Sequence, residues 1–253
     1  MQFSEQRLRR LASPKANTAD LAHQLTMAGL EVDAIESMAP AFTGVVVGRV
    51  VSTEPHPDAD KLRVAMVDVG QPEPLQIVCG AANVRADIRV PVATVGAVLP
   101  GDFRIKAAKL RGVASSGMLC AEQELGLAEQ SDGLWELPLD APIGADIREY
   151  LALDDQLITL GLTPNRGDCL SLRGLARETA AVFDLDIQLP LPSAMTATTE
   201  YQREIVIEDT SACPRYVGRV IRGLRQASSP VWLVDGLRRY GVRSVSPLVD
   251  ITQ

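Results

Sequence analysis

The chain has 253 residues, of which 46% are hydrophobic and 23% charged, as in an ordinary globular protein of one or two domains. Its formal net charge of −7 argues against nucleic-acid binding over the whole surface, because phosphate neutralisation needs clustered lysine and arginine, but it leaves room for a local basic patch. No apolar run is long enough to cross a bilayer, and the first residues lack an apolar signal core. We therefore expect a cytoplasmic protein.

The cysteines and histidines form no metal or disulfide signature. Four cysteines lie far apart without a CxxC pair, and the chain has only two histidines. This pattern argues against both a zinc site and a disulfide framework. We expect the cysteines to be reduced, small buried side chains: Cys79, Cys120, Cys169 and Cys213.

The first forty residues predict one helix and one short strand. Leu21 and Leu25 lie one helical turn apart, Thr18 is placed to cap the helix, and Gly29 is placed to end it. The segment EVDAI, residues 31–35, then has the composition of a strand. We expect a small helical layer without a site here.

Residues 44–137 have a different pattern, with short β-branched runs separated by glycine and proline. Several such strands without helices between them indicate a small closed barrel or a sandwich. In KLRVAMVDVG, two-residue alternation puts Val64 and Met66 on one strand face and Ala65 and Val67 on the other. We expect one face to fill a five-stranded barrel.

The segment HPDAD, which contains His56, Asp58 and Asp60, allows two interpretations. Converging carboxylates and a histidine could bind a metal ion. Alternatively, the proline restricts the chain to extended geometry and the aspartates bind backbone amides in a turn. We favour the turn because it accounts for every residue present. Lys61 and Arg63 would then point outward, where they could meet phosphate.

A second basic stretch, DFRIKAAKLRG, carries Arg104, Lys106, Lys109 and Arg111 in an otherwise acidic chain. It could be an edge of the barrel that contacts phosphate, or an ordinary solvated run of charge. The stretch alone leaves both open.

A third charged cluster lies in TPNRGDCLSLRGLARE. Arg166, Arg173 and Arg177 are candidates for contact with RNA or with a partner subunit, with Asp168 and Glu178 beside them. Arg173 and Arg177 lie one helical turn apart. By spacing alone, a capped amphipathic helix with surface salt bridges is the favoured interpretation.

A turn and a helix are predicted around this third cluster. Pro164 and Gly167 mark the turn, and Asp168 or Ser171 can cap the helix that follows. Its apolar face has the helical period: Leu172, Leu175, Ala176 and Val182.

The remaining segments predict a linker followed by the start of another domain. Residues 189–203 are rich in proline, threonine and alanine and are interpreted as the linker. Residues 203–209 and 213–224 have strand composition, and residues 230–253 predict a helix followed by a strand. No hydrolase, Walker, zincin or dinucleotide motif occurs, and neither do the nucleotide motifs of the two synthetase classes, so we predict no catalytic residue.

Six segments in fixed order carry a family resemblance: LTMAGLEVD, HPDADKLRVAMVDVG, IVCGAANVR, KLRGVASSGMLCAEQELGL, LTPNRGDCLSLRGLARE and CPRYVGRVI. Together they closely resemble the bacterial phenylalanyl-tRNA synthetase β subunit, over essentially the whole chain. The second segment alone also resembles free-standing tRNA-binding domains. GAANVR differs from the usual GAPNVR, and the chain stops at Gln253 where the family continues, so we expect a fragment.

The resemblance implies an α subunit as partner in an (αβ)2 enzyme that uses ATP and magnesium to join phenylalanine to tRNA. The α subunit holds the aminoacylation site, so this chain alone is expected to be inactive and to bind no cofactor or metal. Neither DNA nor a membrane is an expected partner. Candidate tRNA contacts are Lys61, Arg63, Arg104, Lys106, Lys109 and Arg111.

The fold implied is α+β, with an OB-fold barrel inserted into a small split α/β domain, followed by the incomplete start of an α/β editing domain. The expected bounds are 1–40 plus 149–190 for the split domain, 41–148 for the OB-fold, 189–203 for the linker and 204–253 for the editing-type segment. Two other functions stay open, namely a free-standing tRNA-binding module and an architectural piece that docks other subunits.

Overall fold

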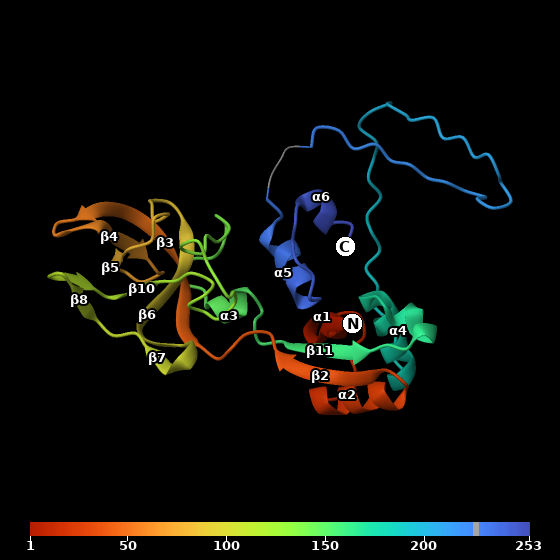
Figure 1. The fold of residues 1–253 in the computed structure, drawn as a ribbon, viewed down its shortest axis with the longest axis horizontal. Helices are drawn as coiled ribbons and strands as arrows, with labels where there is room; N and C mark the ends of the chain where they lie inside the picture. The colour runs from red at the N-terminus through yellow and green to blue at the C-terminus, as the bar shows by residue number, and fades with distance from the viewer. Residues whose placement is uncertain (225–227) are drawn as a thin grey trace.

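A computed structural model describes residues 1–224 and 228–253. The described chain is a mixed α/β protein whose two larger antiparallel sheets lie side by side, with a separate two-stranded hairpin (Figure 1). In the described part of the chain, every helix is too short or too polar to span a membrane.

The smaller sheet combines strands from distant parts of the sequence. Its order is β1 (Gln2–Ser4), β11 (Gln156–Gly161) and β2 (Glu31–Ser37), all antiparallel. Helices α1 (Glu5–Arg9), α2 (Thr18–Met27) and α4 (Leu172–Phe183) pack around it. The larger sheet is formed by the residues between β2 and β11, so the chain leaves the small sheet and returns to it.

The predicted N-terminal helix and strand are confirmed with one correction at the cap. Asn17, not Thr18, is the N-cap, and its side chain accepts the Asp20 N–H at 2.8 Å. Thr18 is the first helical residue, and its hydroxyl donates instead to Glu5 at 2.8 Å. The helix ends before Gly29, which has a φ of +88°, a conformation that glycine adopts at little cost.

The larger sheet has the order β10 (Gly117–Leu119), β6 (Arg89–Leu99), β3 (Thr43–His56), β4 (Ala59–Asp68) and β5 (Leu75–Cys79). The short β7 (Phe103–Arg104) pairs with the end of β6. Strands β8 (Ala108–Leu110) and β9 (Val113–Ser115) form a separate hairpin. The face with Ala65 and Val67 is fully buried, whereas Val64 and Met66 are half-buried, as the alternation predicts.

The expected closure of this sheet into a barrel is not confirmed. The strand ladder starts at β10 and ends at β5, and no ladder joins these two end strands. They do approach each other: the Ser116 N–H donates to the Gln76 carbonyl at 2.8 Å, and the Val78 N–H to the Ser115 hydroxyl at 3.1 Å. The sheet is therefore strongly curved but open in its ladder.

Three short helical elements stand in the connections between strands or before α4. They are the 3₁₀ turn η1 (Pro100–Asp102), helix α3 (Ile147–Tyr150) and the 3₁₀ turn η2 (Pro164–Cys169), which precedes α4. Ser171 is the N-cap of α4, since its hydroxyl accepts the Gly174 N–H at 3.1 Å. Of the two predicted caps, Ser171 is therefore correct. Cys79, Cys120 and Cys169 are free and buried as expected, while Cys213 is partly exposed.

The predictions for the C-terminal part are only partly correct. Residues 189–203 are exposed and have no regular structure, as a linker would. Residues 203–209 and 213–224 form no strand, and α6 (Pro247–Asp250) follows α5 (Val231–Arg239) where a strand was expected. In the described chain these two segments pair with neither sheet, and most of their apolar side chains remain exposed.

Candidate nucleic-acid interface

His56 lies in the tight turn between β3 and β4 and is only 5% exposed. Its Nδ1 accepts the Asp58 N–H at 3.1 Å, and its Nε2 lies 3.0 Å from the Leu110 carbonyl oxygen. The predicted turn is thus confirmed, and both ring nitrogens of His56 face backbone groups. The side chain that bonds to the backbone is not the expected one. The imidazole of His56 bonds to the backbone, whereas the carboxylates of Asp58 and Asp60 are exposed to solvent.

The bond from His56 to Leu110 joins two hairpins that carry exposed cations. Lys61 lies just after the β3–β4 turn, and Lys109 and Arg111 flank Leu110 at the tip of the β8–β9 hairpin. Both hairpins project from the same end of the larger sheet (Figure 1). We call these three exposed side chains the hairpin cations.

Arg63 is not a freely exposed cation. It is half-buried, and its guanidinium donates to the Thr53 hydroxyl at 2.8 Å and to the Thr53 carbonyl at 3.2 Å. These bonds hold the side chain along the surface of β3, so its charge lies beside the strand. The prediction that Arg63 points outward is therefore only partly correct.

Arg104 lies at the other end of β3 from the hairpin cations. It pairs with Val98, which in turn pairs with Thr43 at the start of β3, whereas His56 ends that strand. Lys109 follows Arg104 by only five residues in the chain, so their Cα atoms lie at most about 18 Å apart. Lys106 is exposed and lies two residues after β7. Arg104 therefore belongs to the β6–β7 pair, whereas Lys109 and Arg111 belong to the β8–β9 hairpin.

Arg166 is committed to internal ion pairs. Its guanidinium lies 3.2 Å from Asp168 and 2.9 Å from Glu178, and 3.1 Å from the Cys169 sulfur. The hydrogen bond that Arg166 donates to Asp168 raises the pKa of Arg166, and the same bond lowers the pKa of Asp168. Burial, followed by the bond to Asp168, raises the pKa of the Cys169 thiol to about 11. Arg166 thus fixes the turn before α4.

Arg173 and Arg177, by contrast, are exposed on the outer face of α4, one turn apart. They remain available for a partner. The favoured prediction of surface salt bridges from this helix is correct for Glu178, which reaches back to Arg166.

A buried polar cluster around Arg239 was not foreseen from the sequence. Arg239 of α5 lies 2.5 Å from Asp155 and 2.7 Å from Asp235, and Arg7 of α1 lies 3.4 Å from Asp235. The spacing of Asp235 and Arg239 on one helix was a visible signal. Asp155 is 84 residues away in sequence, and nothing local points to it.

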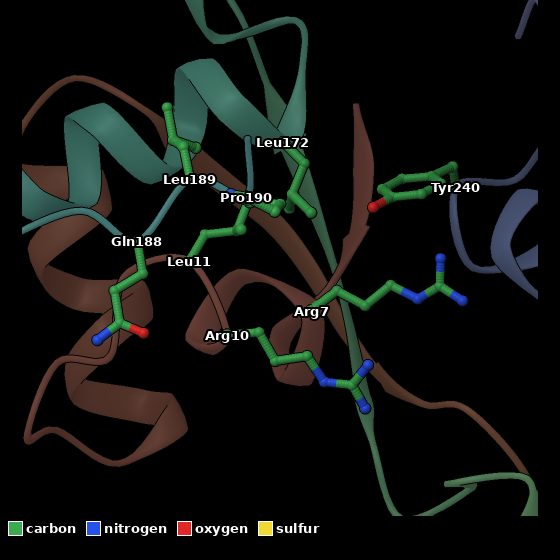
Figure 2. Close-up of a pocket in the computed structure, with 8 residues that line it drawn as sticks. All are labelled: Arg7, Arg10, Leu11, Leu172, Gln188, Leu189, Pro190 and Tyr240. Carbon is green, nitrogen blue, oxygen red and sulfur yellow. The ribbon is translucent and has the colours of Figure 1, made fainter. Parts of the chain in front are cut away.

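Beside this cluster, α1 and α5 border an open hollow of about 560 Å³ (Figure 2). Arg7 and Arg10 extend into it from one side, Tyr240 lies opposite, and Leu189 and Pro190 of the predicted linker close another side. The Arg7 guanidinium carbon lies 6.0 Å from the centre of the Tyr240 ring.

Comparisons with known proteins match both the β-rich region and the C-terminal part. The family model described as "Putative tRNA binding domain" matches residues 45–146, and the B3/4 domain matches residues 212–253. The whole chain aligns, at 55% identity, with a phenylalanine–tRNA ligase beta subunit of Pseudoalteromonas translucida. The same subunit of Hahella chejuensis is 54% identical, and that of Yersinia pestis 53%, again over the whole chain.

The chain is similar over its whole length to the phenylalanine–tRNA ligase β subunits. It spans about a third of their length, 32% in each of these three alignments. The resemblance carried by the six sequence segments is thereby confirmed.

Among solved structures, a MetRS related protein from Pyrococcus horikoshii is 28% identical, with 41% of this chain and 87% of that chain covered and a TM-score of 0.31. The C-terminal domain of Plasmodium vivax p43 is 24% identical, with 40% and 57% covered and a TM-score of 0.30. TM-scores this low support no conclusion about the fold of this chain.

Proposed function

We propose that this chain supplies the tRNA-contacting part of a phenylalanine–tRNA ligase β subunit and that the hairpin cations make the contact. The family match over residues 45–146 supports a tRNA-binding role, and Lys61, Lys109 and Arg111 lie inside that range. A local group of three exposed cations suits phosphate contact in a chain whose net charge is −7. That grouping is the observation on which the proposal rests.

We further propose that the larger sheet is an OB-fold inserted into a split domain. Its five-strand antiparallel order and the approach of Ser116 to Gln76 support a barrel that closes without a full ladder. The domain bounds that we propose are 1–40 plus 149–190 for the split domain, 41–148 for the OB-fold, 189–203 for the linker and 204–253 for an editing-type segment.

The whole enzyme would pair this subunit with an α subunit as (αβ)2 and would act in the cytoplasm. It would use ATP to activate the carboxyl group of phenylalanine, and magnesium would neutralise the charge of the phosphates. In the described residues, one trio of potential metal ligands comes together, Asp168, Cys169 and Glu178. Arg166 already supplies their counter-charge, and a thiol suits magnesium poorly, so the trio does not fit the ion. We assign no ATP or magnesium step to this chain.

Gel-shift titration of the 253-residue chain with tRNA at about 50 mM and about 200 mM salt tests the proposal. Three phosphate contacts predict an affinity loss of roughly 40-fold between the two conditions. Replacing all three hairpin cations by glutamine should remove most of this salt dependence. Because aromatics make up only 4% of the chain, little stacking is available and the affinity should be modest.

A control with the same change in charge is available elsewhere on the surface. Glutamine at Lys15, Arg173 and Arg177, all exposed and outside residues 45–146, should leave binding unchanged. If this control variant loses affinity instead, the contact includes α4 or Lys15 and not the hairpin cations alone. If the unaltered chain gives no shift even at low salt, the tRNA-binding proposal is wrong.

An architectural role is the second candidate. The net charge of −7 and the exposed apolar side chains of residues 201–251 suit a surface that docks other protein parts. Capture of the chain by a cognate α subunit separates the functions. Binding to the α subunit without RNA binding supports architecture, while RNA binding without the α subunit supports a free-standing module.

A further inference from the structure

The β8–β9 hairpin is fastened to the larger sheet at its base by several bonds. The Ser115 hydroxyl accepts the Val78 N–H at 3.1 Å, and the Gln76 side chain donates to the Ala114 carbonyl at 2.8 Å. Residues 106–112, which include the tip, are exposed. An isolated two-stranded hairpin is at best marginally stable in water. The position of the hairpin tip therefore depends on contacts that the tip itself makes with the rest of the chain.

His56 provides the hydrogen bond that holds the tip. The described side chains make one hydrogen bond to residues 108–112, from His56 Nε2 to the Leu110 carbonyl at 3.0 Å. Because Nδ1 accepts the Asp58 N–H, the ring hydrogen is on Nε2, which donates to Leu110. The ring is buried and has both nitrogens occupied, so its orientation is fixed.

We propose that His56 is a positioning residue for RNA binding, which holds Lys109 and Arg111 beside Lys61 so that the three cations meet the phosphates together. This inference rests on the proposed tRNA contact. His56 touches no RNA in this proposal; it acts through Leu110, the residue between the two cations. Without this bond the hairpin tip would sample many positions, and ordering it would reduce the free energy gained on binding RNA.

Two substitutions separate the bond to Leu110 from the bond to Asp58. His56→Asn keeps an oxygen that can accept the Asp58 N–H but is too short to reach Leu110. His56→Gln has a longer side chain whose amide can donate to the Leu110 carbonyl. We expect His56→Asn to weaken tRNA binding about two- to tenfold at low salt, the range of one hydrogen bond, and His56→Gln to recover most of it.

A double-mutant cycle then tests whether His56 acts through the cations. Lys109→Gln with Arg111→Gln should cost clearly less affinity in the His56→Asn background than in the unaltered chain. The salt dependence of binding should also be smaller in His56→Asn. Equal costs in both backgrounds, or full tRNA affinity in His56→Asn, would overturn the inference.

A structural readout keeps this inference separate from the tRNA-binding proposal. Hydrogen exchange of the amides in residues 108–115 should accelerate in His56→Asn but not in His56→Gln, whether or not tRNA binds. Folding of His56→Asn is checked by circular dichroism. Unchanged exchange in the folded variant would show that the bond from His56 to Leu110 does not hold the tip. If exchange accelerates but the unaltered chain binds no tRNA, then the bond from His56 holds the tip and the proposed tRNA-binding function is wrong.

Discussion

At the scale of single residues, the guanidinium of Arg239 is a buried charge held by several partners. Besides its ion pairs with Asp155 and Asp235, it donates to the carbonyls of Leu151 at 2.8 Å and Ala152 at 3.1 Å. Asp155 also accepts from the Ser4 hydroxyl and, at 3.0 Å, from a backbone N–H of α1. A buried charge is costly unless it is paired in this way.

Asp155→Ala should therefore lower the free energy of unfolding by about 3–5 kcal/mol, because it leaves Arg239 buried without its nearest counter-charge. Urea denaturation measures this loss. The adjacent Asp154→Ala is the matched control, since Asp154 is mostly exposed and pairs only with Arg148 at the surface. Its cost should be about 1 kcal/mol or less. Equal losses in the two variants would contradict a special role for the buried pair.

The sequence showed which residues carry charge but not which charges are free. Lys61, Lys109 and Arg111 are exposed as expected, whereas Arg63 is held by Thr53 and Arg166 by internal carboxylates. These partners are set by strand pairing and by the turn before α4. Whether a cation can meet a phosphate is therefore decided by tertiary contacts that local spacing does not contain.

At the scale of elements, the contact between α4 and the preceding turn depends on the absence of a side chain at Gly174. A Cβ atom built there would lie 1.7 Å from the Asp168 carbonyl oxygen. Gly174→Ala must therefore push α4 away from the turn that Arg166 fixes. We expect a loss of about 1–3 kcal/mol in the free energy of unfolding, the usual cost of overpacking.

Thermal and urea unfolding of Gly174→Ala and Gly167→Ala make a matched comparison. A Cβ atom at Gly167, in the same turn, meets nothing within 4 Å, and its backbone does not adopt a positive φ. Gly167→Ala should thus leave stability nearly unchanged. A Gly174→Ala variant as stable as the unaltered chain would show that α4 is not closely packed on this turn.

Elements with a local signal were predictable, and those that need a distant partner were not. Ser171 caps its helix and Gly29 ends another, because capping uses backbone groups within a few residues. The strands predicted at 203–209 and 213–224 have the right composition but pair with no sheet in the described chain. Strand composition describes a preference, whereas a strand also requires hydrogen-bonding neighbours.

At the scale of the whole molecule, α5 is the element that links the parts of the chain. Arg239 binds it to Asp155 near the small sheet. Arg238 donates at 3.3 Å to the carbonyl of Leu127, which lies in the chain between β10 and α3. The segment 191–224, by contrast, extends away from both sheets (Figure 1). Its many exposed apolar side chains are unusual for a surface that meets only water.

Amide hydrogen exchange of the 253-residue chain should reveal this contrast directly. Residues 203–224 lack ladder and helix hydrogen bonds, so their amides should exchange orders of magnitude faster than those of β3, β4 and β6, whose bonds are buried in the larger sheet. Helix α5 should be intermediate, because Arg239 anchors a short helix with an exposed face. Asp155→Ala should then speed exchange in α5 and leave β3 unchanged. Slow exchange throughout 203–224 would mean that these residues form strands in solution after all, with their apolar side chains covered.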